Sequence, residues 1–592
     1  MITKYIYKTI FIGGLLLVVG LFPSCTDRFE SMNVDPINPE YLPGNIGDGE
    51  EDVDDIDLNN KISEADLAAL KSQEGVAPAK FRKFTQEGVI NDYQVTTNLT
   101  HDVYAGYFAN NKPAFRLLSP DYVYTDDYSK KRWNHYYQDR FKEYRELALV
   151  FKHVDKKYAN AYYITRIYMA FLTSMMTDTY GDIPFSAYIQ AKTPPEKASY
   201  DKQDKVYDMI FRILTQAVKN INIENNSFNL GLDDKCYGGD IAKWVRFANT
   251  LRLRLALRIV NIDPERAKKE GEAALADLNG LMMSDADKMR TVPNFALSEN
   301  GGENADEKDE NIFALCAYKW HDAVMSKDIE RAYKEQSARL DPRCPISWYK
   351  PTPWDGLLIN GVESSSTNYT GCEIGNQDIY QSTDAYSTLK CHPTDKKNVR
   401  DDYWFGYSRE MVWLGYAESR FLLAEAALRS WNGTNKTPKE YFEEGVKASL
   451  AYYKIVDNLA NAYLRVLAIN RNPATNPFNT GDKEGMLEQI ITQKWIAVFP
   501  NGNEGWAEFR RTDYPRLQTP AITDRGDVPK DHFIKRIKYP NEELARNAEN
   551  VSKHLQLQGV RLWWDVADTN GMDGKRATTN NFREKDGSFL NK

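Results

Sequence analysis

The sequence predicts an all-α dominated protein in which helix pairs form a platform that carries a large loop-rich region. Three observations predict this class. Apolar residues recur at helical spacing over most of the chain after residue 61. Residues typical of helix starts precede several of these segments. Between residues 341 and 408 the helical spacing stops, and proline, glycine and aromatic residues accumulate instead.

The central helix is predicted at 238–260, GGDIAKWVRFANTLRLRLALRIV, where Asp240 is a suitable N-cap. The end of this segment also alternates with period two, but about twenty residues without proline or glycine far exceed a strand. We expect this helix to be buried on most sides, so that its arginines must reach carboxylates or the surface. Its apolar stripe is Trp244, Phe247, Ala248, Leu251, Leu255 and Ile259, and its arginines are Arg246, Arg252, Arg254 and Arg258.

The order of basic and apolar residues over 1–24 predicts an export signal peptide. Lys4 and Lys8 give a basic start, and the apolar run 10–22 is shorter than the roughly 20 residues that span a bilayer. The run ends in FPSC, which resembles a bacterial lipoprotein cleavage site. We therefore expect Cys25 to become the lipidated N-terminus that holds the protein at a membrane. An ordinary secretory signal with an incidental cysteine is the alternative.

Residues 25–60 predict an acidic flexible tether. The stretch 47–57, GDGEEDVDDID, is densely acidic, and such a composition favours a solvated chain. A calcium-binding loop is the alternative, but the EF-hand spacing of glycine and glutamate is absent.

An N-terminal helical platform is predicted over 61–290. Ser63 is suited to cap its first helix, and the phrase YGDIPFS breaks the helical pattern near residue 181. Asp201 is the expected cap of one later helix, and Asp263 with Pro264 begins another. The main helices are expected at 85–110, 129–154, 157–178, 203–221 and 264–278.

A loop-rich aromatic ligand-binding region is predicted over 291–408. Its first part, 291–311, is polar, and a helix is expected over 320–340. The remainder has no helical spacing, but its many aromatic residues argue against disorder. We therefore expect an ordered, loop-rich subdomain on the helical platform.

A C-terminal helical region that packs on the platform is predicted over 409–592. Thr437, Pro438 and Glu440 match a capping box that begins one of its helices. The helix pairs are similar to tetratricopeptide units, although strict repeats of about 34 residues are not visible. Helices are expected at 410–430, 440–456 and 484–498, followed by a turn at Gly502 and Gly505.

The composition excludes some functions. The net charge of −8 gives no basic field for nucleic acid, and the aromatic content of 12% suits stacking on sugars. Five cysteines follow Cys25, an odd and widely spaced set that is no disulfide framework, although one pair such as Cys372 with Cys391 is open. No CxxC or HExxH spacing occurs, so a structural zinc site is not expected.

A sugar-binding site needs flat aromatic faces beside amides, carboxylates and cationic groups. Aromatic residues on a loop with polar neighbours are therefore the best candidates, and local packing of each ring is the alternative. The candidates are Trp348, Tyr349, Trp354, Asp355 and Asn360 on the long loop, Trp320 before it, and Tyr107 and Asn110 at the end of an earlier helix.

The enzyme alternative is an all-helical glycoside hydrolase with paired carboxylates. Glu504 and Glu508 are four residues apart on a predicted helix, and Glu410 and Glu418 are another option. Helix surfaces carry many such pairs, however, and Glu508 equally suits an ion pair with a following arginine.

Several phrases resemble the SusD/RagB family, a group of outer membrane lipoproteins of Bacteroidetes. KWVRFANTLRLRLALR resembles a family signature closely, and YGDIPFS, AESRFLLAEAALR, EGWAEFRRTDYPRL, RIKYPN and WWD resemble further family phrases. They occur in the order that the family shows, and together they cover most of the chain after Cys25.

The resemblance implies a SusD-like fold and a surface-exposed lipoprotein of the outer membrane. Such a protein captures nutrient oligosaccharides and passes them to a TonB-dependent, SusC-like transporter, with no catalysis and no cofactor. Its implied partners are the transporter, the oligosaccharide and the membrane that holds the lipid anchor. Some family members handle peptides, so the ligand class stays open, as does a purely structural role beside the transporter.

Overall fold

The computed structural model describes the chain between residues 62 and 566, with gaps. The predictions for the signal peptide, Cys25, the tether, Trp354, Asp355 and Asn360 lie outside the described residues. The described residues are 62–89, 92–190, 196–225, 227–292, 311–314, 316, 320, 322–337, 339–351, 368–375, 385–390, 405–406, 409–469, 476–521, 528, 532–551 and 557–566.

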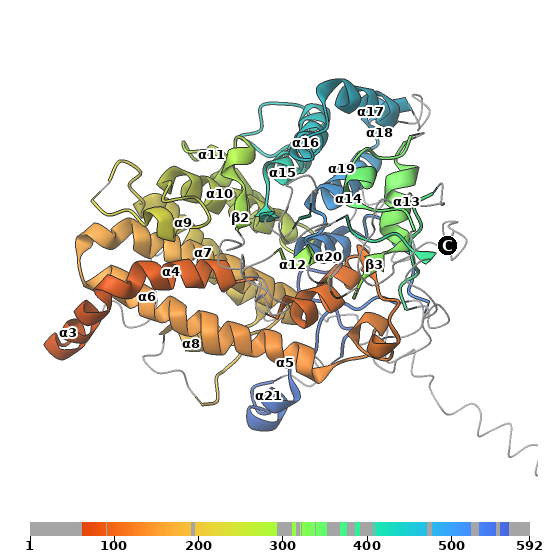
Figure 1. The fold of residues 1–592 in the computed structure, drawn as a ribbon. Coiled ribbons are helices and arrows are strands. Elements are labelled where there is room, and N and C mark those ends of the chain that lie inside the picture. The colour runs from red at the N-terminus through yellow and green to blue at the C-terminus, as the bar shows by residue number, and fades with distance from the viewer. Residues whose placement is uncertain are drawn as a thin grey trace, which may run out of the picture. The chain divides into compact units, whose positions relative to one another are not determined.

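Helices dominate the described part, as the sequence predicts (Figure 1). The α-helices are α3 (Glu64–Gln73), α4 (Ala77–Glu87), α5 (Asp126–Asn134), α6 (Phe141–His153), α7 (Ala159–Tyr180), α8 (Ser186–Gln190), α9 (Gln203–Asn220), α10 (Ile241–Arg258), α11 (Pro264–Ala276), α12 (Ile312–Ala314), α13 (Lys327–Glu335), α14 (Cys344–Ser347), α15 (Tyr416–Leu428), α16 (Pro438–Tyr452), α17 (Asp457–Ile469), α18 (Pro477–Thr480), α19 (Lys483–Val498), α20 (Gly502–Thr512) and α21 (Asn541–Arg546). Two segments, η2 (Gln94–Asp102) and η5 (His135–Arg140), are π-helical.

The described strands are short and form two antiparallel ladders. In the first, β1 pairs with β3, and Phe108 lies opposite Met325. In the second, β2 pairs with β4, and Met289 lies opposite Leu414. Both ladders therefore fasten segments that are far apart in the sequence. The strands are β1 (Phe108–Ala109), β2 (Met289–Thr291), β3 (Val324–Met325) and β4 (Met411–Leu414).

Helix α10 packs against α7, α9, α11 and α15 and is the central helix that the sequence predicts (Figure 1). Its N-cap is confirmed, because Asp240 accepts a hydrogen bond from the backbone N–H of Lys243 at 3.2 Å. The predicted apolar stripe is buried. Each arginine reaches a carboxylate: Arg246 pairs with Asp287, Arg252 with Glu270, Arg254 with Glu418, and Arg258 with Glu504 and Glu508.

Helices α15, α16 and α19 pack beside one another, consistent with tetratricopeptide-like pairs (Figure 1). Helices α15 and α16 approach closely at Gly445, where a Cβ would lie 2.8 Å from the ring of Phe421. The capping box at the start of α16 is confirmed. Thr437 accepts from the N–H of Glu440 at 3.2 Å, and the Glu440 carboxylate accepts from the N–H of Thr437 at 2.8 Å.

Three segments that we predicted as single helices are divided. The segment 85–110 includes the end of α4, the π-helical η2 and strand β1, and 320–340 contains β3 before the shorter α13. The segment 410–430 begins as β4 and continues as α15. These predictions were wrong at the strands, because pairing with a distant segment overrides the local helical spacing.

Asp201 does not cap α9, contrary to the prediction. Its carboxylate accepts hydrogen bonds from the backbone N–H groups of Phe185 at 2.9 Å and Ser186 at 2.6 Å, and from the Ser186 hydroxyl. The aspartate therefore holds the YGDIPFS turn against the chain that leads into α9. The Asp263 cap of α11 is confirmed by the N–H of Arg266 at 3.1 Å.

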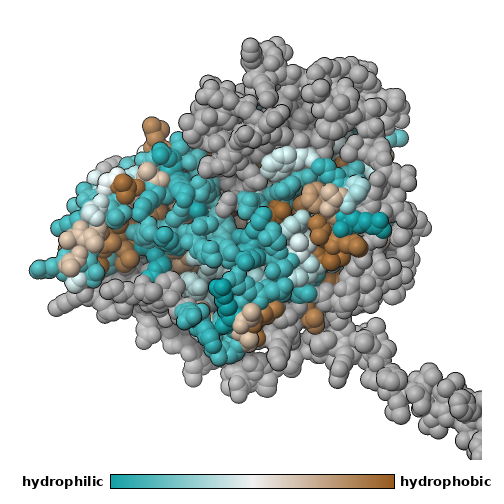
Figure 2. Space-filling model, turned by 60° about the horizontal axis from the view of Figure 1, so that its bottom comes forward, coloured by the Kyte–Doolittle hydropathy of each residue, from teal (hydrophilic) through white to brown (hydrophobic). Residues whose placement is uncertain are grey.

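Hydrophilic residues cover most of the described surface on the face in Figure 2, with smaller groups of hydrophobic residues between them. None of the helices in the described ranges is long and apolar enough to cross a membrane. The large apolar side chains with high exposure include Leu232, Leu278 and Met283.

Candidate functional site

Pairing of β1 with β3 brings two of the predicted site segments together. The chain that leaves β1 at Ala109 runs beside the chain that enters β3 at Val324. Asn110 therefore lies against Asp322, and its side-chain amide donates to the Asp322 carbonyl at 2.5 Å. The ammonium of Lys112 pairs with the Asp322 carboxylate at 3.2 Å and also donates to the carbonyl of Trp320. We call Asn110, Asn111, Lys112, Trp320 and Asp322 the Asn111 site.

The Asp322 carboxylate organises the Asn111 site. Its side chain is 2% exposed, and burial raises its pKa. The side-chain amide of Gln94 and the ammonium of Lys112 both donate to it and oppose that rise. The carboxylate contacts Gln94 and Lys112, which both lie more than 200 residues before it in the sequence, and so fixes the position of the Lys112 ammonium.

Asn111 is the residue that sequence analysis missed. Its side chain is 4% exposed, and neither its amide nitrogen nor its amide oxygen has a hydrogen-bond partner among the described residues. A buried polar group without a partner costs about 1–3 kcal/mol. The amide oxygen can accept hydrogen bonds and the amide nitrogen can donate them, so both capacities of this side chain are unused among the described residues. The signal in the sequence was the asparagine pair directly after an apolar, aromatic stretch and before Lys112-Pro113.

Trp320 is the aromatic residue of this site, and its backbone carbonyl accepts a hydrogen bond from Lys112. Its indole is half-buried and packs in part against the core. The Asn111 site thus combines an indole, an amide, an ammonium group and a carboxylate, which are the groups that hold a sugar ring and its hydroxyls.

Trp348, Tyr107 and Asn110 differ from the prediction. Trp348 is 1% exposed and packs against Phe108 and Phe499, with ring centres 5.6 and 5.4 Å away. Tyr107 is fully buried and donates its hydroxyl to the carbonyl of Trp495 at 2.6 Å. Neither ring is open to a ligand, because both fill the core beside the short ladder. Asn110 is also buried, and its amide is engaged by Asp322 and Lys112, so it positions the loop.

An open pocket lies at the end of α13, and its lining includes Lys350, which directly follows the half-buried Tyr349 in the sequence. Its volume is about 390 Å³, within the range of small-molecule sites. The ammonium of Lys390 lies 5.5 Å from the Tyr349 ring centre. We call this cavity the Tyr369 pocket; its described lining residues are Lys334, Leu340, Lys350, Asn368 and Tyr369.

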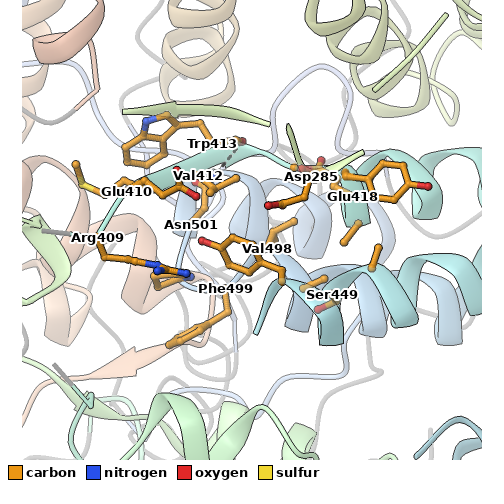
Figure 3. A pocket seen from close by; sticks show the side chains of 18 of the residues that line it. Asp285, Arg409, Glu410, Val412, Trp413, Glu418, Ser449, Val498, Phe499 and Asn501 are labelled. Carbon is orange, nitrogen blue, oxygen red and sulfur yellow. Dashed lines mark hydrogen bonds between the residues drawn. The ribbon is translucent and has the colours of Figure 1, made fainter. Parts of the chain in front are cut away.

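A second pocket lies under β4, between α15, α16 and α19 (Figure 3). Its volume of about 60 Å³ is well below that of small-molecule sites. Glu410 at its edge is paired with Lys288 at 2.7 Å and Arg290 at 2.5 Å, which together hold the pKa of its carboxyl below the usual value despite burial. Asn501 donates to the Trp413 carbonyl at 3.1 Å, drawn dashed in Figure 3.

The carboxylates that we considered for hydrolysis lie in a buried charge cluster. Arg258 pairs with Glu504 at 2.5 Å and Glu508 at 2.7 Å, and Lys494 pairs with Glu504 at 2.7 Å. Arg511 pairs with Glu508 at 2.7 Å, as one of the predicted ion pairs. Burial would raise both pKa values, but the surrounding cations lower the pKa of Glu504 to about 2 and that of Glu508 further. Both carboxyls are ionised at neutral pH, so neither serves as a general acid.

Gly502 and Gly505 do not form the predicted turn but belong to α20. A Cβ at Gly502 would lie 2.2 Å from a carboxylate oxygen of Asp102, and one at Gly505 would lie 2.5 Å from the hydroxyl of Tyr107. The two glycines therefore let α20 approach η2 and the residues before β1. Asp102 accepts a hydrogen bond from the N–H of Gly502 at 3.0 Å across this contact.

No group of three or more His, Cys, Asp or Glu side chains in the described ranges is arranged for a metal ion. Cys372, which we considered for a disulfide, carries a free buried thiol. Cys391 lies outside the described residues.

Comparison with known proteins identifies the family. The family model SusD-like, described as Susd and RagB outer membrane lipoprotein, matches residues 48–565. The chain therefore belongs to the SusD-like family of outer membrane lipoproteins. A search of curated proteins finds no match.

Solved structures with this fold come from several bacteria. A chitin-binding SusD homologue from Flavobacterium johnsoniae is 27% identical, with a TM-score of 0.66, and the match covers 84% of this chain and 99% of that one. A SusD homologue from Bacteroides uniformis is also 27% identical, with a TM-score of 0.66 and coverage of 83% and 99%. A homologue from Parabacteroides distasonis is 24% identical, with a TM-score of 0.67 and coverage of 83% and 98%, and supports the fold.

Proposed function

We propose that this protein captures nutrient oligosaccharides at the outer cell surface and passes them, without catalysis or cofactor, to a TonB-dependent, SusC-like transporter. In this proposal, lipid on Cys25 holds the protein at the outer membrane. The body of the protein then presents the Asn111 site to the ligand.

The observation that carries the proposal is the buried amide of Asn111, which has no hydrogen-bond partner among the described residues, in a site where Lys112 donates to the carbonyl of the half-buried Trp320. Sugar hydroxyls both donate and accept hydrogen bonds, and therefore complement an amide that has neither kind of partner among the described residues. The sugar ring stacks on the indole, and Lys112, positioned by Asp322, donates to further hydroxyls. Such contacts fix orientation without breaking a bond.

The family supports this role, because a relative of 27% identity is described as chitin-binding. Chitooligosaccharides are therefore the first ligands to test. Peptides are the alternative ligands, since an amide and an ammonium group also bind peptide carbonyls. The hydrolase alternative has little support from Glu504 and Glu508, because both are buried, ionised and paired with cations.

Calorimetric titration of the chain from residue 26 with a panel of oligosaccharides and peptides tests the proposal. We expect oligosaccharide binding without release of reducing ends. Trp320→Ala and Asn111→Ala should each weaken binding about tenfold or more, which corresponds to about 1.4 kcal/mol. Trp563→Ala is the matched control, because Trp563 is also half-buried but lies in another part of the chain, against Tyr207.

Three results would overturn the proposal. Binding of peptides with no oligosaccharide affinity would change the ligand class. Turnover of a bound sugar would make the protein an enzyme. Equal losses with Trp320→Ala and Trp563→Ala, accompanied by a lower melting temperature, would show that the Trp320 effect is structural.

A further inference from the structure

We propose that a small cavity among the N-terminal helices binds a halide anion, with chloride as the natural ligand. The cavity is lined by Arg132 of α5, His135 and Arg140 of η5, Thr96 of η2 and apolar residues of α7, and we call it the Arg132 cavity. Its volume of about 30 Å³ lies far below the roughly 300–1,000 Å³ of sites for organic ligands. Its occupant must therefore be nearly as small as a water molecule. This proposal goes beyond sugar capture and does not depend on it.

Arg132 is a buried cation without a carboxylate partner among the described residues. It is 8% exposed, and its guanidinium donates to three neutral oxygens: the carbonyl of Thr96 at 3.0 Å, the hydroxyl of Thr97 at 3.2 Å and the side-chain oxygen of Asn503 at 2.9 Å. Asp102 is the aspartate whose charge acts on Arg132, but burial raises the pKa of Asp102 to about 8. That carboxyl is therefore mostly protonated at neutral pH. Because arginine stays protonated in proteins, its charge needs a counter-ion.

The second guanidinium of the cavity already has its carboxylates. Arg140 pairs with Glu143 at 2.9 Å and with Glu87 at 3.3 Å. Lys83 pairs with Glu143 at 3.0 Å. Two cations thus face two carboxylates, so this group of four is neutral and supplies no counter-ion to Arg132.

His135 is the remaining basic residue in the lining. One of its ring nitrogens lies 3.6 Å from the carboxylate of Asp139, which is half exposed and does not line the cavity. Solvent and salt screen a carboxylate in such a position. None of the described lining residues is acidic, so the charge of Arg132 is left unbalanced inside the cavity.

The hydrogen-bond donors of the lining also favour an anion. The Nε of Arg132 and the Nε of Arg140 are both buried, and neither has a hydrogen-bond partner among the described residues. Both residues line the same cavity. Two N–H donors complement a group that only accepts hydrogen bonds, as a halide does. A water molecule would also have to donate its own protons and would leave the charge of Arg132 unbalanced.

The position of the cavity is the last argument. Residues of both described π-helical segments, η2 and η5, contribute to its lining. Such segments are rare and occur frequently at functional sites. The chain that leaves η2 continues into β1 and the Asn111 site, so an anion held here would also stabilise the segment that carries this site.

Crystals grown with sodium bromide in place of sodium chloride test the proposal directly. Bromide scatters anomalously, and we expect an anomalous peak in the Arg132 cavity beside the two guanidinium groups. Ordinary density without an anomalous signal would show that water fills the cavity and would overturn the proposal.

Thermal unfolding of the full-length chain in a non-ionic detergent tests binding in solution. Sodium gluconate replaces sodium chloride at constant ionic strength, because gluconate is too large for the cavity. A ligand of the folded state alone should raise the melting temperature by about 1 °C for each tenfold rise in chloride above its dissociation constant. No rise with chloride, relative to gluconate, would overturn the proposal, even if bromide occupies the cavity at crystal concentration.

A matched pair of variants links the effect to the cavity. Arg132→Gln removes the unbalanced charge and should abolish the dependence on chloride. Arg145→Gln is the control, because Arg145 is 9% exposed and donates to the carbonyl of Tyr188 at 2.8 Å but does not line the cavity. It should lower the melting temperature and keep the dependence on chloride. An unchanged dependence in Arg132→Gln would overturn the proposal, and where this variant does not fold, the bromide experiment on the original chain decides.

Discussion

Arg258 and Glu508 lie 250 positions apart in the sequence, and the guanidinium of Arg258 donates to the Glu508 carboxylate at 2.7 Å. Both side chains are 1% exposed. A second nitrogen of Arg258 donates to Glu504 at 2.5 Å. These charge-assisted hydrogen bonds join α10 to α20, and thus the phrase KWVRFANTLRLRLALR to the phrase EGWAEFRR.

Removal of Arg258 should therefore destabilise the fold strongly. In Arg258→Ala, Glu504 and Glu508 stay buried but lose a cation, and we expect the free energy of unfolding to fall by about 3–5 kcal/mol. Urea unfolding followed by circular dichroism measures the change. The control is Lys436→Ala, which removes an exposed pair with Glu444 and should leave the midpoint almost unchanged. A small effect of both variants would contradict a structural role for the buried cluster.

Asp102 should make stability fall as pH rises. Burial raises the pKa of its carboxyl from 3.8 to about 8, against the opposing hydrogen bonds from Asn98 and Gly502. A folded-state pKa above the unfolded value means that the folded state holds the proton more tightly. The contribution is complete below pH 3.8 and is lost as pH rises to about 8, at up to about 1.4 kcal/mol per pH unit.

Asp102→Asn tests this pH dependence. The new amide can still accept from Gly502, and its nitrogen can donate to the side-chain oxygen of Asn98, which has no partner among the described residues, after that amide rotates. We expect the variant to flatten the slope of stability between pH 4 and pH 8, measured by urea unfolding at a series of pH values. A slope equal to that of the original chain would contradict the raised pKa.

Gly502 should not tolerate a side chain. In Gly502→Ala the new Cβ would lie 2.2 Å from the Asp102 carboxylate, so α20 and η2 must separate. We expect a loss of about 1–3 kcal/mol in unfolding free energy, typical of overpacking. Gly75→Ala is the control, because no atom of the described residues lies within 4 Å of a Cβ there. Losses of similar size in both variants would point to backbone effects rather than to the contact with Asp102.

Cys25 should carry the lipid anchor. In Cys25→Ser we expect no incorporation of labelled palmitate and release of the protein from the membrane fraction, because multiple acyl chains are needed for stable anchoring. Ser24→Ala keeps a small residue before the cysteine and should remain labelled. Palmitate incorporation into Cys25→Ser would show that the attachment site lies elsewhere.

Features that depend on neighbouring residues followed from the sequence. The caps at Asp240, Asp263 and Thr437 were predicted and are confirmed, because a capping side chain bonds to backbone only two or three residues away. The division of the chain at 290 and 408 stays a prediction.

Only part of the candidate site could be predicted from the sequence. Trp320 and Asn110 were selected separately, and the pairing of β1 with β3 brings their segments together. Trp348 and Trp320 were both selected as aromatic candidates from the sequence, yet Trp348 fills the core and Trp320 is half-buried. Residue type and spacing do not predict which ring packs in the core, as Trp348 does against Phe108 and Phe499.

By itself, the sequence determined the helical class, the apolar face of α10, and the need of its arginines for carboxylates, since local spacing and the cost of burying a charge are properties of the residues. Only the tertiary structure decided which carboxylates pair with these arginines and why α20 carries glycine at 502 and 505. It also decided that Asn111 is buried without a hydrogen-bond partner among the described residues. Arg254 and Glu418 are 164 positions apart, Arg258 and Glu508 are 250 apart, and Asp102 and Gly502 are 400 apart, and no local pattern encodes such contacts.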